Sequence, residues 1–327
     1  MPNTASSPVA APGSVREFLE GWLAHMRGRV RRGTFEGYES LVRLHALPTL
    51  GELELIAVTP LRLQRLYGEL LAGDGGRALA GGSVLNLHLV LTQAFGQAVR
   101  WQLLLANPAA GAQPLRPRRS PRLVADPQLV ERVLAATEGS PFELPCALAV
   151  ATGMRRGEIL ALRWSDLDAD WSAARVMRTL QPTQHGLVFE EPKTQRSRRT
   201  VLLPVFVRPY LQRQHERQQE RHHTLGDSWH DDGLLIDRGN GAPLNPDSLS
   251  AGWSRFLRKQ SLPPLRFHDL RHAHATLLLL QGVHPKIVSE RLGHASVGIT
   301  LDTYSHVLPT MQEEAAQAFD SLFPAAR

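Results

Sequence analysis

Residue types that suit attack on a phosphodiester bond lie together between positions 268 and 304. This segment reads HDLRHAHATLLLLQGVHPKIVSERLGHASVGITLDTY and contains His268, Arg271, His294 and Tyr304. A tyrosine hydroxyl has an unperturbed pKa of about 10, so at neutral pH it attacks a phosphate only when a base accepts its proton. Cationic groups must also neutralise the phosphoryl oxygens. Histidine and arginine are the residue types that meet these two needs.

The run HDLRH at 268–272 allows two interpretations. Two histidines four positions apart on a helix can chelate zinc, but the metalloprotease motif has Glu directly after the first His, where this chain has Asp269. The sequence marks no third zinc ligand either. Because residues three apart share a helix face, we expect His268 and Arg271 to touch one phosphate from two sides. A zinc hydrolase is the weaker alternative, and no metal or other cofactor is expected.

A second motif, TGMRRGE, occupies residues 152–158 at the predicted start of a helix. An arginine at a helix entry can present its guanidinium to a phosphate beside free backbone N–H groups, and a glutamate one turn later can hold it. These residues are Arg155 and Glu158, whereas Arg156 points elsewhere around the helix. Taken alone, a surface arginine with a local ion pair is the commoner explanation.

A third motif, PKTQRSRR, lies at 192–199, between two predicted strands. Lys193 on such a hairpin tip can donate a proton to a leaving 5′ oxygen, as general acid catalysis requires. A basic turn is more often only solvated. The fourth motif places Leu292-Gly293-His294 ten residues before Tyr304, where a helix-end histidine and an ordinary tyrosine are the simpler interpretation. Each of these motifs gains weight only in company with the others.

Charge favours a polyanionic partner. Lys and Arg outnumber Asp and Glu by 37 to 31 in the 327 residues, and basic balance is typical of nucleic-acid binding. The arginines concentrate in two clusters, which we interpret as phosphate contacts, with a solvated face and a solvated linker as the alternative. The clusters comprise Arg27, Arg29, Arg31 and Arg32, then Arg116, Arg118, Arg119 and Arg122.

The single cysteine and the lack of long apolar runs indicate the compartment. Cys146 lies in the apolar run LPCALAV and has no partner for an intrachain disulfide, which indicates a reducing environment. No apolar run reaches the roughly 18 residues that a membrane span needs, and the N-terminus lacks the basic-then-apolar order of a secretory signal. We therefore expect a cytoplasmic protein without a membrane partner.

Helical periodicity predicts four short helices between residues 15 and 99. Thr34 is expected to cap the second helix, which would be ended by Pro48 and Gly51. Thr59 followed by Pro60 predicts the start of the third helix, and Ser83 is expected to open the fourth. A Pro-rich stretch without apolar period follows and is typical of a linker.

The second half is predicted to combine helices with a small antiparallel sheet. Three strands are expected, at 175–180, 186–190 and 199–203, where the apolar period becomes strand-like. Helices are expected near 127–137, 142–163, 207–224, 246–260, 268–281, 284–292 and 309–322.

Taken together, the four motifs resemble those of the tyrosine recombinase (phage integrase) family. TGMRRGEILALRWSD, PKTQRSRRT, HDLRHAHAT and LGHASVGITLDTYSH match that family in order and spacing, and the resemblance covers residues 14 to about 320. It implies a mainly α fold with a small antiparallel sheet, in which a helical core-binding domain precedes an α+β DNA breaking-rejoining catalytic domain. No arm-binding module is expected before the first helix. The expected divisions are a disordered lead at 1–13, the helical core-type DNA-binding domain at 14–109, a linker at 110–124 and the catalytic domain at 125–327.

By this resemblance, Tyr304 attacks the scissile phosphate to give a 3′-phosphotyrosyl link and a free 5′ hydroxyl. Arg155 and Arg271 clamp the nonbridging oxygens, and His294 donates a further hydrogen bond. Two guanidiniums and a histidine then neutralise the charge that a metal ion would otherwise neutralise.

The same resemblance assigns His268 as proton acceptor, Lys193 as the acid for the leaving oxygen, and Glu158 and Asp166 as supports. The implied activity is site-specific recombination that integrates or excises a mobile element, by a homo-tetramer on paired double-stranded DNA sites, with a place for an accessory directionality factor. A type IB topoisomerase-like enzyme and a catalytically decayed DNA-binding relative are the alternatives. The intact set of site residues argues against decay.

Overall fold

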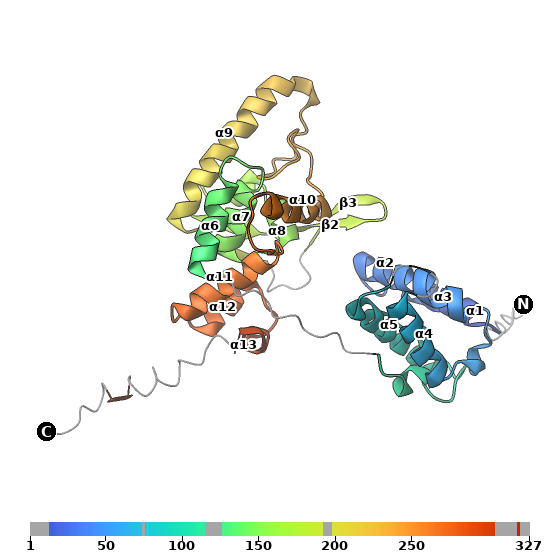
Figure 1. Cartoon of the computed structure of the whole chain (residues 1–327). Coiled ribbons are helices and arrows are strands. Elements are labelled where there is room, and N and C mark those ends of the chain that lie inside the picture. The colour runs from blue at the N-terminus through green and yellow to red at the C-terminus, as the bar shows by residue number, and fades with distance from the viewer. Residues whose placement is uncertain are drawn as a thin grey trace, which may run out of the picture. The chain divides into compact units, whose positions relative to one another are not determined.

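The structure is a computed structural model that describes residues 13–73, 76, 78–114, 126–191, 198–304 and 319–320. The chain divides into two compact units, Met1–Pro121 and Arg122–Arg327, and each is described by itself (Figure 1). None of the described helices is long and apolar enough to cross a membrane. The expected helix at 309–322 lies almost entirely outside the described residues.

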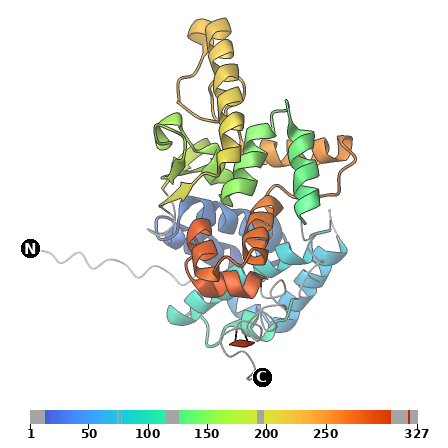
Figure 2. The same cartoon turned by 90° about the vertical axis from the view of Figure 1, so that its left-hand side faces the viewer.

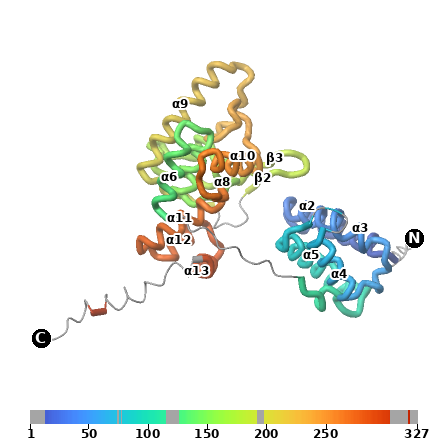
Figure 3. Tube along the Cα trace, in the orientation of Figure 1, coloured from blue at the N-terminus to red at the C-terminus, as the bar shows by residue number. Residues whose placement is uncertain are grey.

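Unit 1 is built from helices packed around one apolar core (Figure 3). Phe18 and Trp22 are buried in it, and the ring of Phe18 stacks on Phe95 at 6.0 Å between centroids. The described elements are α1 (Val15–Met26), α2 (Arg32–Leu41), the π-helical turn η1 (Val42–Ala46), α3 (Leu47–Leu50), the 3-10 turn η2 (Leu55–Ala57), α4 (Pro60–Ala72), α5 (Gly81–Arg100) and the 3-10 turn η3 (Pro108–Gly111).

Two of the expected helix starts in unit 1 are wrong, and one is confirmed. The hydroxyl of Thr59 accepts a hydrogen bond from the backbone N–H of Arg62 and caps α4, as predicted. Thr34 and Ser83 instead lie inside the first turns of α2 and α5, which begin at Arg32 and Gly81 without a side-chain cap. A hydroxyl residue in the first turn is compatible with a helix, so its presence alone did not locate the cap.

Of the two residues expected to end the second helix, Gly51 does lie at the C-cap of the helical path, but Pro48 does not end it. The helical path continues through η1 into α3, where Pro48 occupies one of the first positions and the chain reaches Leu50. A proline is tolerated there because its missing N–H would have no intrahelical acceptor in a first turn.

The described part of unit 2 combines the eight helices α6 to α13 with two small antiparallel sheets. Its helix α9 projects beyond the rest of the unit in both views (Figures 1 and 2). The helices are α6 (Pro127–Thr137), α7 (Glu143–Thr152), α8 (Arg156–Leu160), α9 (Arg208–Leu225), α10 (Pro246–Lys259), α11 (Asp269–Leu280), α12 (Pro285–Leu292) and α13 (Val297–Tyr304), with the 3-10 turns η4 (Trp164–Asp166), η6 (Val205–Val207) and η7 (Gly226–Ser228) and the short helical end at 319–320.

The strands differ in number from the prediction. Strand β1 (Ala173–Val176) pairs with β4 (Arg199–Leu202), and β2 (Thr179–Thr183) pairs with β3 (Gly186–Glu190). The single strand expected at 175–180 is therefore split between two sheets, because the chain leaves the first sheet at Met177 and Arg178 and enters the second at Thr179.

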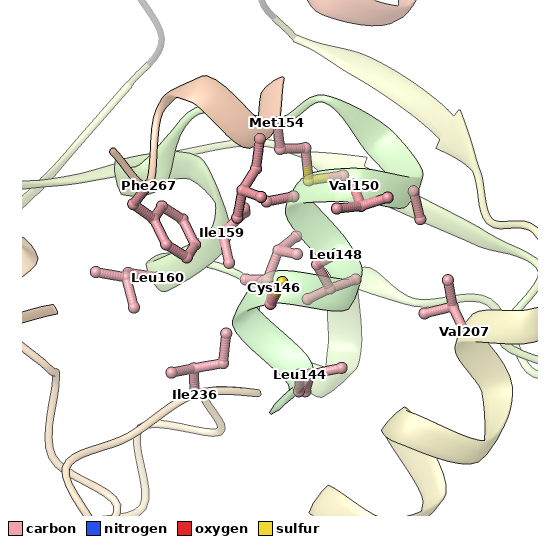
Figure 4. Packing of buried hydrophobic residues seen from close by; sticks show 14 of the residues in the cluster. Leu144, Cys146, Leu148, Val150, Met154, Ile159, Leu160, Val207, Ile236 and Phe267 are labelled. Carbon is pink, nitrogen blue, oxygen red and sulfur yellow. The ribbon is translucent and has the colours of Figure 1, made fainter. Parts of the chain in front are cut away.

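Helix α7 is the centre of unit 2. All its residues are buried, as expected for a helix that is apolar all round. It packs against α11 and contributes Leu144, Cys146, Leu148 and Val150 to the core (Figure 4). Burial raises the pKa of the Cys146 thiol to about 12. The stretch 142–163, predicted to be helical, is divided into α7 and α8, because Gly153 adopts a left-handed conformation (φ 64°) that ends α7.

Candidate active site

The break between α7 and α8 positions Arg155. Gly153 is required there, because a Cβ atom on it would lie 2.6 Å from both His274 Cδ2 and Leu292 Cδ2. Arg155 follows in an extended conformation at the N-cap of α8. Its Nη1 donates to Glu158 Oε1 at 2.7 Å, and its backbone N–H donates to Glu158 Oε2 at 2.9 Å. The glutamate therefore fixes both the backbone and the guanidinium of Arg155.

Glu158 is buried and holds a second arginine. Arg199, the first residue of β4, donates through Nη2 to Glu158 Oε2 at 2.9 Å. Burial alone would raise the pKa of the Glu158 carboxyl, but Arg199 and then Arg155 outweigh it and hold that pKa below its usual value. Glu158 is consequently ionised at neutral pH and joins two guanidiniums.

Three successive carbonyls at the end of α12 each accept a hydrogen bond from a different arginine. Arg199 Nε donates to the carbonyl of residue 291 at 2.6 Å, Arg271 Nη2 to that of residue 292 at 2.8 Å, and Arg155 Nη2 to that of residue 293 at 3.3 Å. The last carbonyls of a helix lack intrahelical partners and carry partial negative charge. We call Arg155, Arg199 and Arg271 the arginine cradle. It joins α8, β4 and α11 to α12.

Arg271 is the most buried member of the cradle. It is 4% exposed, and its Nη1 also donates to the carbonyl of Gly153 at 2.5 Å. A buried guanidinium needs such partners because an unsatisfied buried charge is costly. The side chain of Arg155 is 41% exposed, so its guanidinium is more accessible to a ligand than that of Arg271.

His294 directly follows the three carbonyls to which the arginine cradle donates. Gly293 ends α12 in a left-handed conformation (φ 66°), and the backbone N–H of His294 donates to the carbonyl of Ser289. Partial burial, then the charges of Arg271 and Arg155, lower the pKa of His294 to about 4. Its Nδ1 lies 2.8 Å from the Thr300 hydroxyl. With Thr300 as donor, the neutral ring keeps its proton on Nε2 and can donate from there.

His268 precedes the first turn of α11. The protein around its ring, then the charge of Arg271, lower its pKa, so it is neutral at pH 7 and able to accept a proton. Its ring meets that of His272 edge to face at 5.1 Å. Within the described ranges, no group of three or more His, Cys, Asp or Glu is placed to hold a metal ion. The described residues therefore give the HDLRH pair no further zinc ligand.

Helix α13 carries the backbone of Tyr304 at its last position and packs against α12. Its side chain lies outside the described part of the structure, as does Lys193. The linker cluster, Arg116, Arg118, Arg119 and Arg122, is outside it as well. The sequence did not predict α13 as a helix.

Two other groups of predicted residues have contacts of their own. Asp166 Oδ2 accepts from Arg178 Nη1 at 2.6 Å and from the backbone N–H of Arg163, so it organises the entry to β2. The remaining predicted DNA contacts are exposed around the turn between α1 and α2, where Arg27 lies over the Phe35 ring. They are Arg27, Arg29, Arg31 and Arg32.

Sequence reasoning missed Arg199 and Thr300. Arg199 belongs to the basic motif PKTQRSRR, in which it was given no role, although the alternation of residues along the following strand could have indicated one. In β4 and just beyond it, Val201 and Leu203 are buried while Thr200 and Leu202 are exposed. Alternation with a period of two therefore places Arg199 on the buried face. For Thr300, the sequence offered only a hydroxyl residue six positions after His294.

Acid should destabilise unit 2 between about pH 6.5 and 4. The pKa of His294 and that of His274 are both lowered from 6.5 to about 4, in each case mainly by burial. The unfolded chain binds more protons in this window, so stability present above 6.5 is lost as pH falls. This loss of stability can be measured by hydrogen exchange of the α11 amides, corrected for the intrinsic exchange rate at each pH. His274→Gln should weaken the dependence of stability on pH, whereas His223→Gln, on exposed α9, should leave it unchanged. If the stability of the wild-type protein does not change between pH 6.5 and 4, the lowered pKa values of these histidines are wrong.

Comparisons with known proteins identify the family. Residues 126–311 match the phage integrase family, and residues 14–71 match the N-terminal SAM-like domain of phage integrases. The first match covers more than half of the chain. The chain therefore belongs to the phage integrase family, whose members are tyrosine recombinases.

Individual relatives agree with the family match. A tyrosine recombinase XerC-like protein of Caldanaerobacter subterraneus is 26% identical, over 94% of this chain and 83% of its own. The ICEBs1 integrase of Bacillus subtilis is 31% identical, over 75% of this chain and 67% of its own.

Solved structures show the same fold. The Tn1549 transposon integrase in complex with transposon right end DNA has a TM-score of 0.78 at 23% identity, covering 95% of this chain and all of that one. A lambda integrase tetramer bound to a Holliday junction has a TM-score of 0.61 at 18% identity, covering 88% and 77%. The family match and the curated relatives favour a recombinase over a topoisomerase-like enzyme.

Proposed function

We propose that the chain performs site-specific DNA recombination, integrating or excising a mobile element, with Tyr304 as nucleophile. One observation carries this proposal: Arg155 and Arg271 are both held at the helix end that leads into His294, ten residues before Tyr304. Two guanidiniums and a neutral imidazole converge there. This is the charge distribution that stabilises a pentacoordinate phosphorane-like transition state.

The proposed reaction balances without a cofactor. The Tyr304 oxygen bonds to the scissile phosphorus while the bond from phosphorus to the 5′ oxygen breaks. His268 accepts the phenolic proton, and Lys193 donates a proton to the departing 5′ oxygen. Arg155, Arg271 and the Nε2–H of His294 stabilise the nonbridging oxygens. A 3′-phosphotyrosyl link preserves the energy of the broken ester, so a second 5′ hydroxyl can reverse the step.

The partners follow from the same proposal. Double-stranded DNA is the substrate, and the exposed arginines between α1 and α2, together with the linker arginines, contact its phosphates. Because the lambda integrase is recorded as a tetramer on a Holliday junction, we propose a homo-tetramer on paired sites for this chain, with an accessory factor setting direction.

A trapping experiment tests the function. The protein is incubated with a library of nicked duplexes of randomised sequence, from which the short 5′-hydroxyl fragment diffuses away after cleavage. DNA that stays attached to protein in SDS is sequenced and then remade as one selected duplex. We expect enrichment of one site and an undiminished covalent band after treatment with EDTA. Absence of covalent DNA would refute the proposal, and loss of the band on chelation would revive the zinc alternative.

The role of Lys193 can be tested separately. Lys193→Ala should slow cleavage by about 10² to 10⁴, because the 5′ oxygen then leaves without a proton. A duplex with sulfur in place of that bridging oxygen releases a thiolate, which needs no acid. Cleavage of the sulfur duplex by the variant should approach the wild-type rate in single-turnover assays, while Lys259→Ala, on the exposed end of α10, should match wild type on both. An equal defect on both duplexes contradicts the assignment.

A further inference from the structure

Arg199 connects parts of the candidate site that are distant in sequence. Its Nη2 donates to Glu158 Oε2 at 2.9 Å, and its Nε donates to the carbonyl of residue 291 at 2.6 Å. Glu158 in turn holds Arg155. The carbonyl precedes His294 by three residues in the chain. One guanidinium thus fixes the distance between the carboxylate that orients Arg155 and the helix end that orients His294.

The burial of Arg199 separates its role from that of Arg155. The Arg199 side chain is 8% exposed, whereas that of Arg155 is 41% exposed. The Arg199 side chain is therefore largely covered by protein, whereas that of Arg155 is open to solvent. Its packing is also close, because a Cβ atom on Gly293 would lie 3.0 Å from Arg199 Nη1.

A neighbouring arginine supports the same helix end from another side. Arg291 Nη2 donates to the carbonyls of Ala151 and Leu202 at 3.1 and 3.3 Å. The strand that begins at Arg199 is therefore tied to α12 through side chains in both directions.

We propose that Arg199 is a positioning residue for DNA cleavage, setting the geometry of Arg155 and His294 through Glu158 and the end of α12. The proposal rests on the recombinase function stated above. In this proposal Arg199 acts on the reaction through Glu158 and the end of α12. Without its fork, Glu158 Oε2 loses its guanidinium donor and retains the backbone N–H of Arg155, and the end of α12 loses one of its three arginine contacts.

Arginine and lysine are not equivalent at this position. A guanidinium donates in two directions from a planar fork, while a lysine ammonium is a single point at the end of a flexible chain. Arg199→Lys keeps the positive charge next to Glu158 but cannot hold the carboxylate and the carbonyl in the same geometry. Small misplacements of catalytic groups cost about 10²-fold in rate. We therefore expect Arg199→Lys to lower the cleavage rate roughly 10- to 100-fold at saturating DNA, with the DNA dissociation constant within about threefold of wild type.

The test uses single-turnover cleavage of the selected nicked duplex by the full chain. Arg199→Lys and Arg199→Gln are each made alone and combined with Arg155→Lys. Because Arg199 acts through Arg155, its effect should shrink at least threefold in the Arg155→Lys background, as coupled residues in a double-mutant cycle do. Arg199→Gln should be slower than Arg199→Lys, which shows partial rescue by the conservative change.

Arg217→Lys is the matched control. Arg217 donates to Glu143, a carboxylate as buried as Glu158, but between α9 and α7. A purely structural role predicts that Arg217→Lys and Arg199→Lys lower the melting temperature and the cleavage rate alike. A positioning role predicts that only Arg199→Lys slows cleavage.

The outcomes are distinct. A slower cleavage step, unchanged DNA affinity and non-additivity with Arg155→Lys support the proposal. An unchanged rate, full additivity, or a defect shared with Arg217→Lys overturns it. If Arg199→Gln does not fold, Arg199→Lys decides alone. If the wild-type protein forms no covalent complex, the recombinase function itself is refuted. If the wild-type band is normal and the Arg199 variants cleave at the wild-type rate, only the role of Arg199 is refuted.

Discussion

Tyr304→Phe is expected to abolish the covalent protein–DNA band completely while leaving DNA affinity unchanged. The substitution removes only the oxygen that bonds to phosphorus, and the phenyl ring preserves the shape of the side chain. No neighbouring group can substitute for it as a nucleophile under the proposed mechanism. The measurement is the SDS-resistant band on the selected nicked duplex, next to a gel-shift titration of the same duplex.

The other three tyrosines already have structural roles. Tyr67 is buried, and its hydroxyl hydrogen-bonds His88. The hydroxyl of Tyr38 donates to Gln93 at 2.9 Å, and Tyr210 lies under the guanidinium of Arg213. Tyr210→Phe is the matched control and should keep the full band. A band of normal intensity with Tyr304→Phe would show that another residue is the nucleophile.

Arg271→Lys is expected to lower the cleavage rate by about 10² to 10³, the usual effect of removing one donor to a developing oxyanion. Arg271 donates to the carbonyls of Gly153 and Leu292 from one rigid fork. Lysine offers one ammonium in place of that fork, so it cannot reproduce both contacts, and its charge moves relative to the phosphate. Single-turnover cleavage at saturating DNA measures the effect.

The Arg271 variant should also lose thermal stability, because two buried carbonyls lose their donors. Arg213→Lys provides a control for this loss. It weakens a contact to the equally buried Glu143, and it should lower the melting temperature without slowing cleavage of the remaining folded protein. Arg271→Lys with a rate within threefold of wild type would exclude a direct role for Arg271 in charge neutralisation.

The sequence predicted local contacts well and long-range contacts poorly. The pairing of Arg155 with Glu158 followed from a spacing of three residues on a helix, and the structure contains that contact. The bonds of Arg199 and Arg271 to the end of α12 span 92 and 21 residues. No local pattern encodes such distances, since they depend on how β4 and α11 pack against α12.

The errors in the fold have the same origin. The apolar period runs on from α7 into α8, so periodicity marked 142–163 as helical without locating the break at Gly153. That glycine is needed because His274 and Leu292 pack against its α-carbon, which is again a tertiary constraint. The overall composition of the fold, mainly helical with small antiparallel sheets, followed from periodicity and was confirmed.

The three carbonyls that hold the arginine cradle have a consequence for protein synthesis. They belong to residues 291–293, whereas the arginines that bond to them begin at residue 155. A nascent or prematurely terminated polypeptide that ends before α12 contains all three arginines but none of these acceptors. Its guanidiniums are therefore unaligned, and it also lacks Tyr304. Under the proposed mechanism, cleavage competence therefore arises only after translation has passed residue 304, and shorter chains are not expected to nick DNA.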